Sequence, residues 1–191
     1  MDLFKWFSKS GCNCKRLLTL KNISHILAVH LTFDAFICYK RNSGEDFAEH
    51  LQMGLEELGI HTFLDIKDIP EKFRGTDEWT TTRDNALIES KNFLLIITAG
   101  FELSVEIKKE LSLARKSADK KFIYLRHCDL RPHLKITLDT EELDLGKQQQ
   151  IIFETKQELL RKAVTVLKEH KMPTTTSNDK DLFDKQLEGI L

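Results

Sequence analysis

The chain has 191 residues, of which 41% are hydrophobic and 31% are charged, and its formal net charge is −1. This length predicts one domain with appendages, and the composition is that of a soluble globular protein. The balanced charge argues against a nucleic-acid binder, which would present a strongly basic surface.

Residues 1–31 precede the first strong element and are predicted to be an N-terminal extension. They carry five basic side chains against a single acidic one, and MDLFKWFSK places apolar side chains on one helical face with lysines between them. This pattern is compatible with membrane contact by residues 1–30, although an extension that is poorly ordered or packs on itself is the preferred interpretation. No segment has the roughly 18 uncharged apolar residues that a spanning helix needs.

Strand and helix patterns alternate after this extension. Phe33–Tyr39 is an apolar run typical of a central parallel strand that is buried on both faces. A helix is predicted to start at Ser43, in a capping-box-like sequence, and to end at Gly59, which suits a left-handed C-terminal position. Ile60–Leu64 is a second predicted strand, and Asp65–Gly75 is a polar loop.

The alternation continues through the middle of the chain. Thr76–Glu89 is predicted to be a helix, and Asn92–Thr98 a third buried strand. Ser104 is a suitable N-cap for a third helix. The apolar residues of this helix that fall in register are Ile107, Leu111, Ala114 and Ala118.

The last third of the chain is less regular. Lys121–Leu125 is predicted to be a fourth strand, and His133–Leu138 a fifth, weaker one. Residues 150–169 have the pattern of an amphipathic helix. Residues 171–191 have the composition of a linker followed by a short C-terminal helix.

This order of elements predicts a doubly wound α/β domain. Strands that alternate with helices form a parallel sheet, and ligands bind such a sheet at the carboxyl ends of its strands. The loops after Tyr39, Leu64 and Thr98 are therefore expected to converge at that edge. They bring together Lys40–Gly44, Asp65–Gly75 and the segment that leads to Glu110.

Signatures of several other site classes are missing from the sequence. No histidine pairs with Ser or Cys at triad spacing, and neither a GxGxxG motif nor a P-loop follows Tyr39. Cys12 and Cys14 are too close to bridge each other and have no partner pair at zinc spacing, so no metal site is expected. Cys38 lies inside an apolar strand and is predicted to be a small buried hydrophobe. The cysteine pattern indicates a reducing, cytoplasmic compartment.

Several of these segments resemble a Toll/interleukin-1 receptor (TIR) domain. FDAFICY resembles the first-strand box of that family, an aromatic-Asp-Ala-Phe-Ile-Ser-Tyr pattern, and LGIHTFLD resembles the strand that leads into its long BB loop, here Asp65–Gly75. SKNFLLIIT resembles the third strand. Ser104-x-x-x-x-x-Glu110-Leu111 resembles the helix that carries the catalytic glutamate of enzymatic members. The similarity covers about residues 33–170.

The resemblance implies a flavodoxin-like fold, with a five-stranded parallel sheet and helices on both faces, over residues 32–170. It is closest to the NAD+-cleaving branch, because Lys40–Gly44 and Lys109-Glu110-Leu111 match segments of that branch. A single TIR domain without an attached sensor is typical of prokaryotic members. The implied setting is innate immunity or antiviral defence in the cytoplasm.

The activity implied by the resemblance is hydrolysis of the nicotinamide–ribose bond of NAD+. The products would be nicotinamide and ADP-ribose or a cyclic isomer, with NAD+ as the substrate and no cofactor. Glu110 is the implied catalytic residue, since one carboxylate can stabilise an oxocarbenium-like transition state. Counting 100° per residue places Glu110 at the margin of the buried helix face, where a carboxylate is partly desolvated.

The residues proposed to bind substrate follow from the same matches. Lys40 and Arg41 are candidates for holding the pyrophosphate, with ordinary loop charge as the alternative. Asp65 would either contact ribose or cap the loop, and Phe73 lies near the position where the family places an aromatic over nicotinamide. The full set of candidates is Lys40, Arg41, Ser43, Asp65, Phe73 and Lys109.

One departure from the family pattern keeps two other functions open. Many enzymatic members carry Trp four residues before the glutamate, where this chain has Glu106, and Trp79 is not an obvious substitute. A non-enzymatic TIR adaptor and a host-directed effector that acts by TIR–TIR binding are the alternatives. In each case the resemblance implies self-association through the BB loop at residues 65–75, with a separate sensor or effector protein as a partner.

Overall fold

The computed structural model describes residues 33–131, 134–138, 141–168 and 189. The predicted extension at 1–31 and its membrane contact lie outside these residues, as do Cys12, Cys14 and nearly all of the predicted linker and C-terminal helix. Among the described helices, none has the length and apolar character to cross a membrane.

A five-stranded parallel sheet forms the centre of the fold, with strand order β2-β1-β3-β4-β7. Its strands are β1 (Ala35–Tyr39), β2 (Thr62–Phe63), β3 (Asn92–Ile97), β4 (Lys121–His127) and β7 (Gln150–Phe153). The register pairs Cys38 with Leu95 between β1 and β3, and Tyr124 with Gln150 between β4 and β7. The predicted five-stranded parallel α/β fold is therefore confirmed.

The identity of the fifth strand was predicted wrongly. The segment predicted as His133–Leu138 contains β5 (Lys135–Thr137), which pairs antiparallel with β6 (Glu142–Asp144) in a separate two-stranded sheet. The fifth strand of the main sheet is β7, which lies inside the segment predicted as one helix from residue 150. A strand of four residues with only three apolar ones shows no clear periodicity, so only its pairing with β4 distinguishes it from the first turn of a helix.

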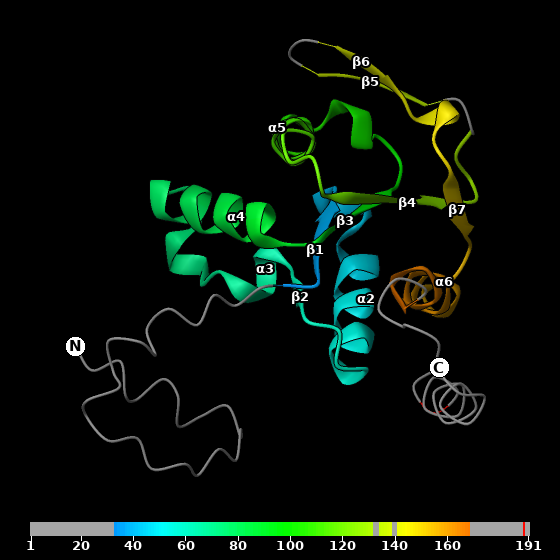
Figure 1. Ribbon diagram of the computed structural model, residues 1–191, viewed down its shortest axis with the longest axis horizontal. Helices are drawn as coiled ribbons and strands as arrows, with labels where there is room; N and C mark the ends of the chain where they lie inside the picture. Colours follow the sequence, from blue (N-terminus) through cyan, green and yellow to red (C-terminus); the bar gives the residue numbers. More distant parts are fainter. Residues whose placement is uncertain (1–32, 132–133, 139–140, 169–188, 190–191) are drawn as a thin grey trace. The chain divides into compact units, whose positions relative to one another are not determined.

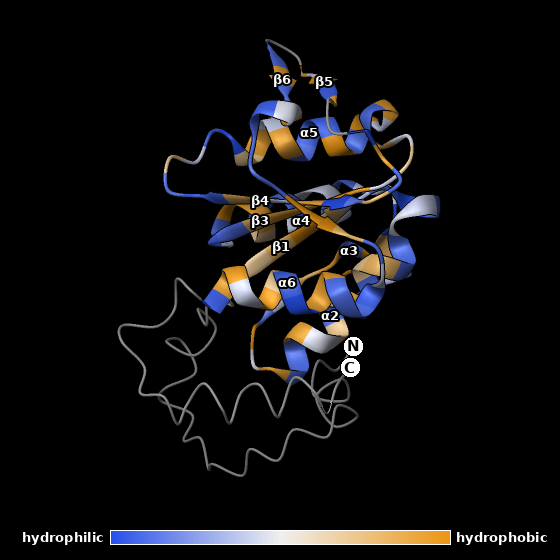
Figure 2. Cartoon of the chain, turned by 90° about the vertical axis from the view of Figure 1, so that its right-hand side faces the viewer, coloured by the Kyte–Doolittle hydropathy of each residue, from blue (hydrophilic) through white to orange (hydrophobic). Residues whose placement is uncertain are grey.

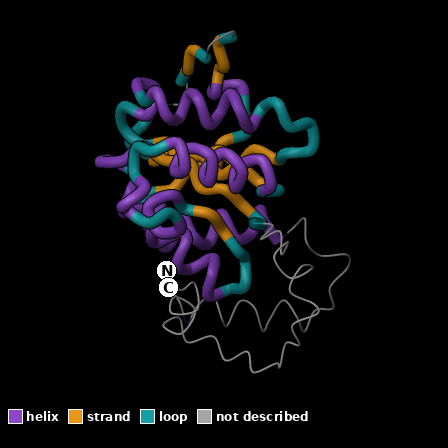
Figure 3. Tube along the Cα trace, turned by 90° about the vertical axis from the view of Figure 1, so that its left-hand side faces the viewer, coloured by secondary structure: helices purple, strands orange, loops and turns teal. Residues whose placement is uncertain are grey.

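Helices cover both faces of the sheet (Figure 1). They are α2 (Glu45–Glu57), α3 (Asp65–Asp68), α4 (Asp77–Glu89), α5 (Val105–Ala114) and α6 (Lys156–Lys168). Figure 2 shows the apolar strands between α5 on one side and α2 and α6 on the other, and Figure 3 shows the same layers from the opposite side. The three-layer arrangement explains why the strands are apolar on both faces.

The two halves of the core follow the alternation of side chains along β1. Phe36 and Cys38 pack with Ile107 and Leu111 of α5, whereas Ile37 packs with the helices α2 and α6. Consecutive strand residues point to opposite faces, so Cys38 lies on the α5 side.

Helix boundaries confirm some predicted caps and correct others. Ser104 accepts a hydrogen bond from the Ile107 N–H as the N-cap of α5, and Gly59 has the left-handed φ of +71° expected after α2. Ser43 does not cap α2, whose N-cap is Gly44, because its hydroxyl bonds to Thr98 and to the Ala99 carbonyl instead.

Two further segments differ from their predicted form. The loop Asp65–Gly75 contains the short helix α3 and a 3-10 turn at Glu71–Phe73. The helix α5 ends at Ala114, so Ala118 is not part of it. The second difference lies at a helix end, where local pattern gives the least information.

Candidate functional site

A cleft of about 910 Å³ lies at the carboxyl end of the sheet. It is bounded by the end of β1 and the segment after it, by Asp65 at the start of α3, and by one side each of α4 and α5. The residues that matter most for its chemistry are Arg41, Asp65, Trp79, Arg83, Glu106 and Glu110. Its size is within the range of small-molecule sites, and its position is the one predicted from the topology.

Glu110 is a buried carboxyl group in the wall of this cleft. Its exposed fraction is 9%, and it projects from the margin of the apolar face of α5 that Ile107 and Leu111 form. Burial raises the pKa of Glu110 to about 7, against the opposing effects of a hydrogen bond with Cys38 and of the Arg83 charge. The group therefore changes charge near neutral pH, as residues at functional sites often do.

Arg83 lies close to three acidic side chains, one of which is Glu110. Its guanidinium lies 2.8 Å from Asp84 Oδ1, 2.8 Å from Glu106 Oε2 and 3.7 Å from Glu110 Oε1. The Arg83 side chain is 8% exposed, so these pairs are shielded from solvent on the arginine side. Although burial opposes the effect, hydrogen bonds from Arg83 and Lys109 hold the pKa of Glu106 below its ordinary value. Glu106 thus remains an anion that anchors Arg83.

A second charged group lies across the cleft. Arg41 donates to Asp65 Oδ2 at 2.8 Å, and the Tyr39 hydroxyl donates to Asp65 Oδ1 at 3.0 Å. Burial and the Asp65 charge raise the pKa of Tyr39, so its hydroxyl stays protonated as a donor. Asp65, the first residue of α3, therefore orients Arg41.

Two cationic side chains lie near the indole ring of Trp79, on the same side of the cleft as Asp65. The guanidinium carbons of Arg41 and Arg74 are 5.4 Å and 5.8 Å from its ring centroid, within the range of cation–π contacts. The indole is 5% exposed and lines the cleft. An aromatic face beside two guanidinium groups is suited to a planar, anionic ligand.

The structure brings together most, though not all, of the residues proposed from the sequence. Lys40, Arg41, Asp65, Lys109 and the catalytic candidate Glu110 line the same cleft. The Lys40 side chain passes close to the backbone of Gly100, where an added Cβ would lie 2.5 Å from Lys40 Nζ.

Two candidates are placed elsewhere. Ser43 is engaged by Thr98 and does not line the cleft, and Phe73 packs against the core under the cation of Lys72, 4.6 Å from its ring centroid. Contact of either side chain with a substrate remains a prediction.

Sequence reasoning missed three residues of the site. Trp79 and Arg83 were visible only as members of one helix side, and Cys38 only as a buried hydrophobe. A signal for Arg83 was present, because a cation inside an otherwise apolar helix face requires a buried acidic partner. Nothing in the local sequence relates Cys38 to Glu110, since the first lies on β1 and the second on α5.

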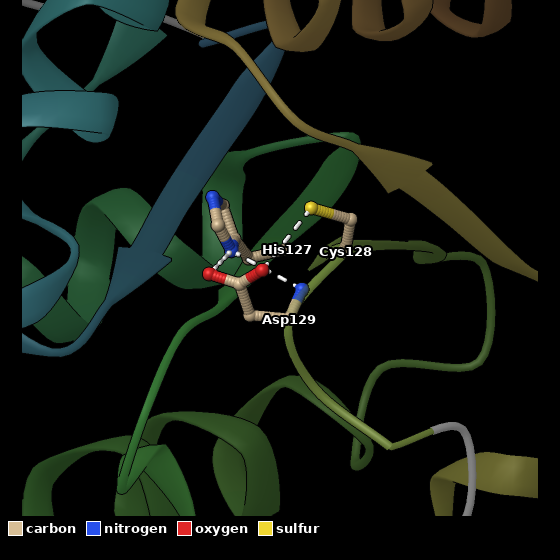
Figure 4. A group of neighbouring side chains, drawn as sticks. All are labelled: His127, Cys128 and Asp129. Atoms are coloured by element: carbon tan, nitrogen blue, oxygen red, sulfur yellow. Dashed lines mark hydrogen bonds and ion pairs between the residues drawn. The ribbon is translucent and has the colours of Figure 1, made fainter.

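A separate group of polar side chains follows the end of β4 (Figure 4). His127 Nδ1 lies 3.4 Å from Asp129 Oδ2, and Cys128 Sγ is 3.6 Å from Asp129 Oδ1. Both polar contacts join Asp129, so the thiol and the imidazole do not form a nucleophile–base pair here. These consecutive residues are largely exposed, and the expectation that the protein needs no metal stays a prediction.

Comparison with known families identifies the domain. A family model described as "TIR domain" matches residues 35–167, well over half of the chain. A search of curated proteins finds no match.

One solved structure supports the fold, and a second is reported as a weaker likeness. The TIR domain of the Toll-related receptor TRR-2 from Hydra magnipapillata has a TM-score of 0.52 and 17% identity, over 72% of this chain and 99% of that one. At this identity the likeness shows the fold alone. A metazoan TIR-STING receptor from C. gigas, in complex with 2′,3′-cGAMP, has a TM-score of 0.46 and 16% identity, over 68% of this chain and 38% of that one.

Proposed function

The chain belongs to the TIR domain family, and from that premise we propose that it is an NAD+ hydrolase of the NAD+-cleaving branch. It would cleave the nicotinamide–ribose bond and release nicotinamide with ADP-ribose or a cyclic isomer. The observation that carries the proposal is the position of Glu110, a buried carboxyl group in a cleft lined by cations. NAD+ offers both features that such a cleft would recognise, an anionic pyrophosphate and a ribose that becomes cationic.

Glu110 would act on the sugar. Nicotinamide leaves with the electron pair of the broken C–N bond, because it departs as a neutral pyridine from a cationic pyridinium. The ribose then carries positive charge, which an ionised carboxylate stabilises. A water molecule adds to the anomeric carbon and loses a proton, which gives ADP-ribose; attack by another group of the same nucleotide would give a cyclic product.

The opposite side of the cleft would hold the rest of the nucleotide. Arg41, kept in place by Asp65, and the neighbouring Lys40 supply positive charge for the pyrophosphate. Arg74, which like Arg41 lies over the Trp79 ring, adds positive charge on the same side of the cleft. Lys109, Ser43 and Phe73 remain candidates for substrate contact, and no cofactor is proposed.

The cellular role follows from the family in the same way. We propose innate immune or antiviral defence signalling in the cytoplasm, triggered or received by a separate protein. Self-association through the loop at residues 65–75 would regulate the activity.

A non-enzymatic adaptor is the second candidate. The observation that favours it is the pairing of Glu106 with Arg83, because this ion pair occupies the position at which many enzymatic members have Trp. A host-directed effector that acts by TIR–TIR binding is a variant of this function.

The deciding experiment is NAD+ turnover by the purified protein at high concentration with a crowding agent. We expect nicotinamide release from the wild type and from Glu57→Ala, an exposed helix variant, and none from Glu110→Ala. Chromatography of the second product would separate linear from cyclic ADP-ribose. No turnover by a wild-type protein that demonstrably self-associates would favour the adaptor.

A further inference from the structure

The hydrogen bonds of Arg83 are made with acidic residues other than the one proposed to be catalytic. Nε and Nη2 donate to Asp84 Oδ1 at 3.0 Å and 2.8 Å, and Nη1 donates to Glu106 Oε2 at 2.8 Å. Glu110 Oε1 lies 3.7 Å from Nε, whose single hydrogen is already donated to Asp84. Glu110 therefore has the charge of Arg83 nearby without a hydrogen bond from it.

Glu106 holds the guanidinium from α5. It precedes Glu110 by one helical turn, so the two carboxyl groups lie on the same side of the helix. Its Oε2 accepts from Arg83, and its Oε1 accepts from Lys109 Nζ at 3.3 Å. Asp84 accepts from the other edge of the guanidinium. The cation is thus fixed between two acceptors, neither of which is Glu110.

Without Glu106, one edge of the guanidinium would lose its acceptor. The Arg83 side chain is only 8% exposed, so an N–H group without a partner there is costly. Glu110 is the remaining carboxyl group that the structure pairs with Arg83. Glu106 and Glu110 therefore compete for the same cation, and Glu106 holds it.

Several groups act on Glu110 at once. Besides Arg83 on α4 and Glu106 on α5, they are Cys38 on β1 and Asp65 at the start of α3. A substitution at Glu106 leaves Cys38 and Asp65 in place. Glu106 itself acts in two ways, because its negative charge disfavours ionisation of Glu110 and its oxygen restrains Arg83. The two effects need separate variants.

We propose that Glu106 is a positioning residue, which holds the Arg83 guanidinium away from Glu110, so that Glu110 faces substrate without a short ion pair. The role rests on the proposed hydrolase function. A carboxylate in a short ion pair with arginine ionises at lower pH, and its oxygens are committed to that partner. With the cation restrained, Glu110 is available to the ribose and becomes ionised closer to neutral pH.

Two substitutions at Glu106 separate charge from position. Glu106→Gln removes the charge and retains an oxygen that accepts from Arg83, whereas Glu106→Ala removes both. Each should move the rising limb of the kcat/KM profile for NAD+ to lower pH. The shift should be larger in Glu106→Ala by about one pH unit, the size of one hydrogen bond to a charged group. The control Glu57→Ala removes an exposed helix carboxylate and should leave the profile in place.

An Arg83→Met background tests the cation itself. Glu106→Gln and Glu106→Ala should give equal shifts there, since no guanidinium remains to move. Equal shifts in the wild-type background would show that only the charge of Glu106 acts, and would overturn the positioning role, as would unmoved profiles. Glu106 is 57% exposed, so the variants are expected to fold. Glu106→Met, which also lacks an acceptor, replaces Glu106→Ala if thermal unfolding shows otherwise.

A second readout needs no enzymatic activity. The free energy of unfolding falls with rising pH until Glu110 is ionised, and urea titrations from pH 5.5 to pH 9 locate the end of this fall. The end should move to lower pH in Glu106→Gln and further in Glu106→Ala. Such shifts without any NAD+ turnover would retain the role of Glu106 and reject the hydrolase. Turnover with an end point that does not move would reject the role of Glu106 alone.

Discussion

At the scale of single residues, Glu110 is the proposed catalytic group, and its environment keeps its pKa near neutrality. Burial raises that pKa from 4.5 to about 7, whereas Arg83 and Cys38 lower it. Between these two pH values the folded state binds more protons than the unfolded state does. The free energy of unfolding therefore falls as the pH rises from about 4.5 to about 7, and the loss is complete above pH 7.

Glu110→Gln tests this relation directly. The variant should be more stable than the wild type at pH 8, by up to ~3 kcal/mol, because no buried charge has to form. At pH 4 the difference should nearly vanish. Urea unfolding at the two pH values measures the effect, and Glu57→Gln at an exposed position is the matched control. Equal pH dependence in wild type and variant would contradict the buried, shifted carboxyl group.

Arg83 is expected to stabilise the site as well as the fold. Replacement by Met leaves Glu110 without its cation, so the pKa of Glu110 should rise further and the rising limb of activity should move to higher pH. The free energy of unfolding at pH 8 should fall by about 2–4 kcal/mol, since breaking a buried pair leaves a charge uncompensated. The same replacement at the exposed Arg161 is the control. An Arg83→Met variant with unchanged stability and profile would show that Arg83 does not act on Glu110.

At the scale of elements, the packing of α2 against α6 reverses the effect on stability that helix propensity alone predicts for a substitution at Gly54. Gly54 lies inside α2, where helix propensity favours Ala by about 1 kcal/mol. The structure places the fully buried Leu160 of α6 against Gly54, and an added Cβ would overlap both Leu160 methyl groups. The glycine thus allows α2 and α6 to approach closely.

Gly54→Ala is therefore expected to destabilise the protein by about 1–3 kcal/mol, because the core cannot absorb the extra methyl group. The sign should reverse in a Leu160→Ala background, where the space is free and helix propensity dominates. A double-mutant cycle by urea unfolding measures this coupling. A stabilising Gly54→Ala in the wild-type background would show that the two helices lie farther apart.

At the scale of the whole molecule, the cleft opens at one edge of the sheet, where the loop at residues 65–75 also lies. Leu103 and Val105, beside the start of α5, are 74% and 62% exposed, which is high for large apolar side chains. A site bordered by a long loop and exposed apolar side chains is suited to completion by a second copy of the chain.

Self-association predicts that NAD+ turnover per molecule rises with protein concentration. Rates measured over two decades of concentration, beside sedimentation velocity at the same concentrations, test this directly. Activity strictly proportional to concentration, with a monomer throughout, would contradict the assembly. An oligomer with proportional activity would show that assembly is not required for turnover.

The α/β class, the TIR resemblance and the position of Glu110 follow from the amino-acid sequence, because they depend on local periodicity and on motif order. The strands are apolar on both faces, and a helical count places Glu110 at the edge of a buried face. Periodicity is present in windows of ten to fifteen residues, and motif order is read along the whole chain.

Tertiary structure alone decided the fifth strand, the role of Ser43 and the surroundings of Glu110. β7 is a strand because it pairs with β4, and Ser43 bonds to Thr98 rather than capping α2. Arg83 reaches Glu110 from another element, the helix α4. Contacts between residues distant in sequence leave no local periodicity, so only the packed sheet and helices reveal them.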